Sequence, residues 1–282
     1  MEGNCVYFNG EVVPSGQAGL SVFDTGLLHG ASVFTTMLAR NGKVFRLERH
    51  IRRLLATAQR ISLQHGEDAG SLSAGVAEVL ARNELRSARV RITLTPGAVG
   101  AASPTSVITA SPLEEYPRWW YEKGVPVVVC GVRQYSGDPL GGLKTGCYLP
   151  RILARQAAAA QGAEEALWFT ESGHLAEACF CNVFLVRDGV LATPPLSTPV
   201  LAGVVREAII EICAALNITC RDDQPLSYSD ALSADEMFLT SSTAGVRPVM
   251  RIDRSGIGDQ CPGPVTKKIM AEYENLVADE CR

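Results

Sequence analysis

The spacing of apolar residues divides the first part of the chain into short strands and amphipathic helices. Near the start, two apolar runs flank Asn9-Gly10 in CVYFNGEVV, a dipeptide that favours a tight turn between antiparallel strands. Residues 47–61, LERHIRRLLATAQRI, carry apolar side chains at helical spacing, and a second helix is predicted over about 71–85. The runs ARVRITLTPG and TSVITASPL have the pattern of strands. An α+β unit is therefore predicted for this part of the chain.

The second part begins with the apolar strand VPVVVCGV and a helix predicted over 150–161, with proline near its start and Gly162 near its end. Strands are predicted in EALWFT, HLAEACFCNVFLV and VLATP, joined by the turns ESGH and RDGV. GVVREAIIEICAAL is typical of a helix, ITCRDD and EMFLTSS of strands, and the tail GPVTKKIMAEYENLVADEC of a terminal helix. This order argues against a regular βαβα alternation and a doubly wound parallel sheet.

The stretch SPLEEYPRWWYEKG carries two prolines, mixed charge and a tryptophan pair, which indicates a connection between domains. We therefore predict a small N-terminal domain over residues 1–114, a linker over 115–124 and a larger C-terminal domain over 125–282. A length of 282 residues allows two modest domains with a core each. The phosphate loops GxGxxG and GxxxxGK[ST] are absent, so dinucleotide and nucleoside-triphosphate binding lack their usual sequence support.

Composition narrows the class of ligand. A net charge of −4 argues against a nucleic-acid partner and favours small molecules. The N-terminus lacks the pattern of a signal peptide, and no apolar run approaches the roughly 18 residues of a membrane span, so no membrane partner is expected. The nine cysteines include no CxxC pair and the four histidines lie far apart in sequence, so no metal site is predicted. Reduced thiols in a cytoplasmic protein are the simplest interpretation.

Two residues have chemistry that their surroundings do not explain. Lys144, one of five lysines, lies in the turn GGLKTG ahead of an alanine-rich helix. An amine in a pocket can form a Schiff base with a carbonyl compound, because desolvation favours the neutral nucleophile. Glu177 lies in an otherwise apolar strand, where its carboxylate needs a partner such as a protonated heterocyclic nitrogen. Taken alone, Lys144 is better explained as a surface lysine, and Glu177 is equally compatible with an edge-strand glutamate that faces water.

Three further segments could bind an anion. The helix that starts at about Gly203 in LAGVVREAII presents unpaired N–H groups at its N-terminus. TSSTAG, residues 240–245, offers hydroxyls directly after a strand, suited to a phosphate or a carboxylate. Arg53 lies beside the apolar stripe of the first long helix and could point towards an anion. When each segment is taken singly, an ordinary helix end, a polar turn and a solvated helix flank are the better explanations.

Taken in order, these segments resemble the class IV family of pyridoxal-phosphate enzymes, which holds branched-chain and D-amino-acid aminotransferases and 4-amino-4-deoxychorismate lyases. The matching blocks run through nearly the whole chain: FNGE, DTGLLHGASVFTT, VFRLERHIRRL, GGLKTGCYLPRILARQAA, GAEEALWFTESGHLAEACFCNVFLVRDG, LAGVVREAI and ADEMFLTSSTAGVRPV. The resemblance implies a two-domain α+β fold of type IV, with a smaller N-terminal α/β domain and a larger C-terminal β-barrel-like domain with helices. It also implies pyridoxal 5'-phosphate as cofactor, a small amino substrate and a homodimer.

The resemblance also assigns roles to residues of this chain. Lys144 matches the lysine that holds the cofactor covalently and transfers protons, and Glu177 matches the glutamate that faces the pyridine nitrogen. Arg53 matches the phosphate-binding arginine of the HxxRL motif. The remaining cofactor contacts that it implies are the backbone N–H groups of Val204 and Val205, the Ser242 hydroxyl and the Tyr148 ring.

The segment SVFTTM bears on the reaction. Branched-chain aminotransferases typically have Phe-Glu-Gly where this chain has Phe34, Thr35 and Thr36, whereas the lyases typically have Phe-Thr-Thr. Thr36 resembles the lyase residue proposed to protonate the departing enolpyruvate group. This favours a 4-amino-4-deoxychorismate lyase of folate biosynthesis, which releases 4-aminobenzoate and pyruvate. The alternative is a branched-chain or related L-amino-acid aminotransferase that uses 2-oxoglutarate.

The expected substrate contacts do not decide between the two reactions. Arg91 matches a position that branched-chain enzymes use for a distal carboxylate, whereas His29 stands where they often have tyrosine. Thr243 and Ala244, in the hydroxyl-rich segment, are the other expected substrate contacts. Pro96 occupies a position where D-amino-acid aminotransferases and many lyases have arginine, which makes a D-amino-acid aminotransferase the weakest of the three alternatives.

Overall fold

The computed structural model of the protein describes residues 4–100 and 103–282. The chain forms two compact units. The first comprises Met1–Glu114, Lys144–Cys147 and Val277–Arg282, and the second comprises Glu115–Leu143 and Tyr148–Leu276. The segment that carries Lys144 therefore belongs to the first unit, although the sequence places it far beyond the predicted boundary at residue 114. The structure also has a short helix, α4 (Trp119–Glu122), within the predicted linker.

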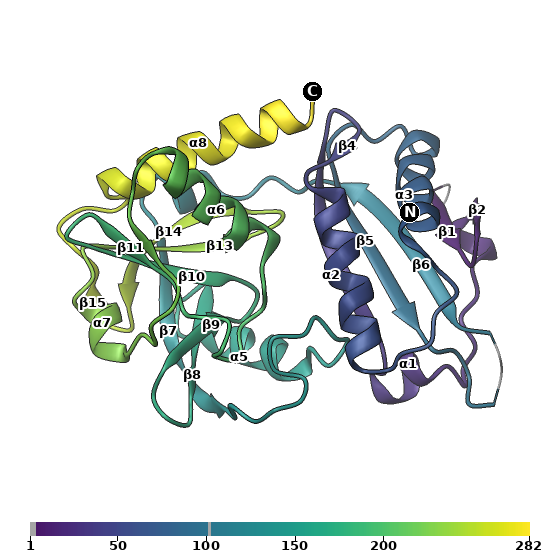
Figure 1. Ribbon diagram of the computed structural model, residues 1–282, viewed down its shortest axis with the longest axis horizontal. Helices are drawn as coiled ribbons and strands as arrows, with labels where there is room; N and C mark the ends of the chain where they lie inside the picture. Colours follow the sequence, from purple (N-terminus) through teal and green to yellow (C-terminus); the bar gives the residue numbers. More distant parts are fainter. Residues whose placement is uncertain (1–3, 101–102) are drawn as a thin grey trace. The chain divides into compact units, whose positions relative to one another are not determined.

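The first unit is built on a six-stranded antiparallel sheet in the order β2-β1-β6-β5-β3-β4 (Figure 1). Its strands are β1 (Cys5–Phe8), β2 (Glu11–Pro14), β3 (Val33–Arg40), β4 (Lys43–Val44), β5 (Ala88–Thr95) and β6 (Thr105–Pro112). The predicted turn between β1 and β2 is confirmed: Asn9 and Gly10 both have positive φ, which this tight turn requires. A short 3₁₀ turn (Ser15–Gln17) and helix α1 (Thr25–His29) lead from β2 into β3.

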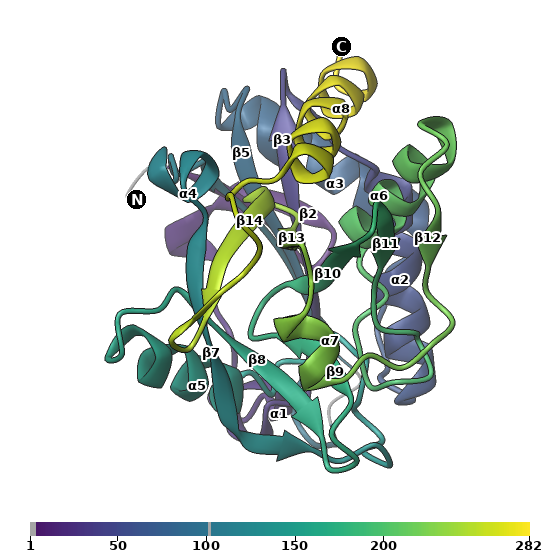
Figure 2. The ribbon, with the colours of Figure 1, turned by 90° about the vertical axis from the view of Figure 1, so that its left-hand side faces the viewer.

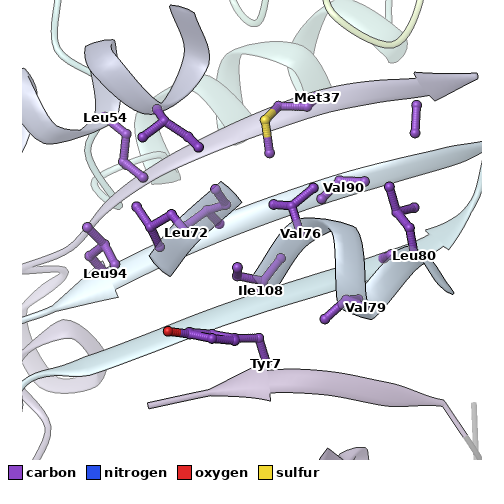
Figure 3. Close-up of a cluster of buried hydrophobic side chains, with 14 of the residues drawn as sticks. Tyr7, Met37, Leu54, Leu72, Val76, Val79, Leu80, Val90, Leu94 and Ile108 are labelled. Atoms are coloured by element: carbon purple, nitrogen blue, oxygen red, sulfur yellow. The ribbon is translucent and has the colours of Figure 1, made fainter. Parts of the chain in front are cut away.

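Two amphipathic helices supply the core of this unit. Helices α2 (Leu47–Arg60) and α3 (Ala69–Arg82) bury their apolar stripes with residues of the sheet, as Figure 3 shows for Leu54 and Leu72 beside Met37, Val90 and Ile108. Such burial contributes about 25 cal/mol per Å² of apolar surface. Helix α3 starts two residues before the predicted position, because Asp68 caps its N-terminus. It ends at Arg82. Its predicted C-terminal residues lie beyond the helix.

The second unit is built on a curled sheet in the order β12-β11-β10-β13-β14-β7-β8-β9 (Figure 2). Strand β15 pairs with β14. The strands are β7 (Val125–Gln134), β8 (Glu165–Thr170), β9 (Leu175–Ala178), β10 (Asn182–Arg187), β11 (Val190–Ala192), β12 (Cys220–Arg221), β13 (Glu236–Ser241), β14 (Gly245–Ile252) and β15 (Ser255–Gly256). Three neighbouring pairs are parallel, β7 with β8, β14 with β7 and β11 with β12, and the others are antiparallel. The predicted α+β class is confirmed.

The run HLAEACFCNVFLV forms two strands where the sequence predicts one. Strand β9 ends at Ala178 and β10 begins at Asn182, because the Ala178 N–H donates to the Cys181 carbonyl at 2.8 Å and closes a turn. Apolar residues continue through the turn, and Cys179 and Cys181 are both buried there. Hydrophobicity alone therefore does not reveal the break at the end of the strand that carries Glu177.

The second unit also contains α5 (Leu149–Ala159), α6 (Val204–Ala215), α7 (Tyr228–Leu232) and most of α8 (Pro264–Glu280). Helix α5 has proline in its first turn, as the sequence predicts. In the part of the chain that the structure describes, no helix combines the length and apolar character needed to cross a bilayer.

Candidate active site

Backbone hydrogen bonds hold the Lys144 segment against the first residues of β3. The Phe34 N–H donates to the Lys144 carbonyl at 3.0 Å, and the Gly146 N–H donates to the Ser32 carbonyl at 2.7 Å. A side chain at position 146 would meet the Ser32 hydroxyl, so glycine lets this segment pack closely against the residues that precede β3. The turn GGLKTG thus fixes where the half-buried Lys144 side chain begins.

Two cationic side chains lie over the Phe34 ring. The Lys144 Nζ lies 4.7 Å from the ring centroid and the Arg91 Cζ lies 3.7 Å from it, both within the range of cation–π attraction. The Arg91 Nε also donates to the Thr93 hydroxyl at 3.0 Å. Thr36 is the direct cross-strand neighbour of Arg91. Lys144 therefore shares the Phe34 ring with Arg91, a predicted substrate contact, and Thr36, a predicted catalytic residue, lies opposite Arg91.

Thr35 links Arg53 to a buried histidine. It points to the opposite face of β3 from Phe34 and Thr36, towards α2. The Arg53 Nη2 donates to the Thr35 Oγ1 at 3.1 Å, and that oxygen lies 2.9 Å from the His50 Nδ1. Because arginine only donates, the Thr35 oxygen accepts this bond, and the same hydroxyl exchanges a second hydrogen bond with the His50 ring.

His50 is held neutral by its surroundings. Burial lowers its pKa well below the ordinary value of 6.5, and the positive charges of Arg53 and Lys144 lower the pKa further. A neutral imidazole can accept from Thr35, whereas an imidazolium cannot. His50 and Thr35 therefore orient the guanidinium of Arg53. Spacing alone did not single them out, although the HxxRL motif contains this histidine.

The lowered pKa of His50 predicts an acid-sensitive fold. Above pH 6.5 the histidine is neutral in both folded and unfolded chains, and its full contribution to stability is present. Below pH 6.5 the unfolded chain takes up a proton that folded His50 does not, so stability falls until the pH reaches the lowered pKa. Relative to His50→Asn, the wild type should lose up to about 1.4 kcal/mol per pH unit in this window. Urea unfolding at several pH values between 7.5 and 5 gives the free energy of unfolding of both proteins. The same change of this free energy with pH in the two proteins would contradict the prediction.

In the second unit, Glu177 is buried on β9 and pairs with a residue that the sequence analysis did not single out. Its Oε1 accepts from the Arg151 Nη2 at 2.5 Å, and its Oε2 accepts from the Leu201 N–H at 3.1 Å. The buried carboxylate does have the partner that its apolar surroundings demand. A cation on the helix after Lys144 was the signal available in the sequence, but spacing alone did not distinguish Arg151 from Arg155.

The predicted phosphate contacts lie at the start of α6. Val204 and Val205 are buried in its first turn, and no side chain caps this helix at Gly203. The Asn182 side chain lies so close to Gly203 that any larger residue there would collide with it. A helix N-terminus without a side-chain cap presents N–H groups and the positive end of its dipole, which suit a phosphate.

The other predicted residues have distinct surroundings. The Tyr148 ring stacks on Phe180 with centroids 5.6 Å apart. Ser242 and Thr243 are half-buried at the turn after β13, and the Thr243 hydroxyl is 2.8 Å from the Tyr116 hydroxyl. Ala244 is buried, and its carbonyl accepts from the Tyr121 hydroxyl at 3.0 Å. His29 is exposed at the end of α1.

These groups match the functional groups of pyridoxal 5'-phosphate. An amine suits its aldehyde, and a buried carboxylate suits its ring nitrogen. A helix N-terminus and an arginine are each suited to its phosphate. The family model described as "Amino-transferase class IV" matches residues 32–252. The chain belongs to this family. Pyridoxal 5'-phosphate is therefore its cofactor, and the enzyme class and type IV fold expected from the sequence are confirmed.

Individual relatives of this class IV enzyme include branched-chain aminotransferases. A putative branched-chain-amino-acid aminotransferase of Methanocaldococcus jannaschii is 32% identical over 96% of each chain. The crystal structure of the Escherichia coli branched-chain amino acid aminotransferase superimposes with a TM-score of 0.92 at 29% identity, covering 99% of this chain and 96% of that one. The crystal structure of the Thermoproteus uzoniensis branched-chain aminotransferase with norvaline superimposes with a TM-score of 0.88 at 30% identity. The match covers 98% of this chain and 96% of that one.

A structure described as a putative 4-amino-4-deoxychorismate lyase from Legionella pneumophila is also similar. It superimposes with a TM-score of 0.82 at 21% identity, covering 92% of this chain and 95% of that one. At this identity the likeness bears on the fold alone. The relatives thus favour the aminotransferase alternative over the lyase that the Phe-Thr-Thr segment suggested.

Proposed function

We propose that this class IV enzyme transfers the amino group of a branched-chain or related L-amino acid to 2-oxoglutarate. The products are the corresponding 2-oxo acid and glutamate. The observation that carries this proposal is the placement of Arg91 and Lys144 on one phenylalanine ring, Phe34. A guanidinium at this place can bind a substrate carboxylate while the amine of Lys144 acts on the same substrate. The identities of the relatives support the same reaction.

Under this proposal each residue of the chain has a defined task. The Lys144 Nζ takes the proton from the α-carbon of the amino acid and returns a proton after the amino group has moved. Pyridoxal 5'-phosphate, when bound, accepts the electron pair of the bond that breaks. Arg53, oriented by Thr35, holds the phosphate together with the N–H groups of Val204 and Val205. Glu177 would accept a hydrogen bond from the protonated ring nitrogen, and Tyr148 and Ser242 are further proposed contacts.

The lyase is the second candidate, and Thr36 is the residue that favours it. The hydroxyl of Thr36 lies on the same face of β3 as Phe34 and opposite Arg91, where it could protonate a departing group. Substrate contacts through His29, Thr243 and Ala244, a homodimeric assembly and a cytoplasmic location stay predictions.

The choice between the two reactions is directly measurable. Purified enzyme loaded with pyridoxal 5'-phosphate is expected to form glutamate from 2-oxoglutarate with leucine, isoleucine or valine. It should release little 4-aminobenzoate or pyruvate from aminodeoxychorismate. Arg91→Met should raise KM for 2-oxoglutarate by about 10-fold or more, because a charged hydrogen bond to the carboxylate is lost. Turnover of aminodeoxychorismate alone would overturn the aminotransferase proposal in favour of the lyase.

A further inference from the structure

The ion pair between Arg151 and Glu177 has more contacts than a simple salt bridge. The Arg151 Nη2 donates to the Glu177 Oε1, and the Nη1 donates to the carbonyls of Ala178 and Cys179 at 3.2 and 3.1 Å. One guanidinium therefore binds both the carboxylate and the backbone that follows it. The side chains are 20% and 6% exposed, so the pair is largely shielded from water and weakly screened by salt.

The second carboxylate oxygen is fixed from the other side. The Leu201 N–H donates to the Glu177 Oε2, while the Leu201 carbonyl accepts from the Asn182 amide at 2.8 Å. Donors on both oxygens set the plane of the carboxylate. Each carboxylate oxygen can accept two hydrogen bonds, so Glu177 can still accept from a third donor.

The charges of this pair stabilise each other. Burial alone would lower the pKa of Arg151, but the charges of Glu177 and Tyr148 and the hydrogen bond to Glu177 outweigh burial and raise the pKa. The guanidinium donates to the Glu177 Oε1 at 2.5 Å, and a charge-assisted hydrogen bond of this kind is short and strong.

We infer that Arg151 is a positioning residue that holds the Glu177 carboxylate in the orientation in which it accepts a hydrogen bond from the cofactor ring nitrogen, so that the proton of this hydrogen bond stays on the nitrogen. This rests on the proposed role of Glu177. A proton on the nitrogen lets the ring accept electrons, and a proton on the carboxylate would remove that capacity. Arg151 thus acts on the reaction through Glu177 and does not need to contact the substrate.

The test compares Arg151→Met with Arg155→Met. Arg155 lies one turn later on α5, is exposed, and has its guanidinium 5.5 Å from the Phe180 ring, which makes it a matched control. Each protein is loaded with pyridoxal 5'-phosphate labelled with ¹⁵N in the ring, and the ¹⁵N chemical shift is recorded. The wild type and Arg155→Met should show a protonated ring nitrogen. Arg151→Met should shift towards neutral pyridine, and its kcat should fall by about 10- to 100-fold with little change in KM.

Arg151→Gln is the second neutral variant, because its amide can still donate to the Ala178 and Cys179 carbonyls if Arg151→Met does not fold. A folded neutral variant with the wild-type ¹⁵N shift would overturn the inference and leave Arg151 a purely structural role. A neutral variant that folds but no longer binds the cofactor would overturn it as well. Failure of the proposed function is a separate result: the wild type itself would then fail to transfer amino groups, whatever the ¹⁵N shifts.

Discussion

Replacement of Lys144 by alanine is expected to abolish amino transfer, with a fall in kcat of at least about 10⁴-fold. Under the proposed roles of Lys144, the variant loses both the amine that binds the cofactor covalently and the base that moves the α-proton. Its fold should persist, because the backbone carbonyl of Lys144 still accepts from the Phe34 N–H. Glutamate formation measures the rate, and circular dichroism at about 220 nm, where helices absorb strongly, reports the fold.

Lys123→Ala is the matched control, because Lys123 is exposed at the end of α4. Borohydride reduction followed by peptide mapping should place the cofactor on the peptide with Lys144 in the wild type and in Lys123→Ala. No labelled peptide is expected from Lys144→Ala. Retention of the label at another lysine would remove Lys144 from its proposed role.

Arg247→Met is expected to lower the free energy of unfolding by about 3–5 kcal/mol, because it leaves the carboxylate of Glu165 buried without its cation. The Arg247 Nη2 lies 3.1 Å from the Glu165 Oε1, and the side chains are 4% and 2% exposed. Strand β7 lies between β14, which carries Arg247, and β8, which carries Glu165. The pair therefore joins strands that do not pair directly.

A double variant separates loss of the ion pair from loss of packing. Arg247→Met with Glu165→Leu removes both charges and should recover most of the stability that Arg247→Met loses. Arg187→Met is the control, because its partner Asp188 is exposed and such surface pairs contribute about 0–1 kcal/mol. Urea unfolding of the four proteins gives the comparison. An Arg247→Met protein as stable as the wild type would show that the buried pair contributes nothing.

Hydrophobic periodicity predicted most elements because each repeats within a few residues of sequence. The helix over 47–61, the Asn9-Gly10 turn and the proline-initiated helix after Lys144 are all confirmed within one or two residues. The break between β9 and β10 was missed, because a turn buried among apolar residues keeps the composition of a strand.

The candidate chemistry was predictable where a residue type was unusual for its surroundings. Lys144 in a glycine-rich turn and Glu177 in an apolar strand each required a partner. Resemblance to the class IV family supplied the cofactor and the role of Arg53. The reaction was not predictable in this way: the Phe-Thr-Thr segment favoured a lyase, whereas the relatives favour a branched-chain aminotransferase.

The sequence by itself determined the α+β class, the family and the chemical groups available to the site. Only the tertiary structure decided which groups meet: Arg151 with Glu177, 26 residues apart, Arg91 with Phe34, and Arg247 with Glu165, 82 residues apart. Local patterns are set by backbone geometry within a few residues. Contacts between distant residues depend on strand register and on how whole elements pack, and a single sequence contains no direct record of either.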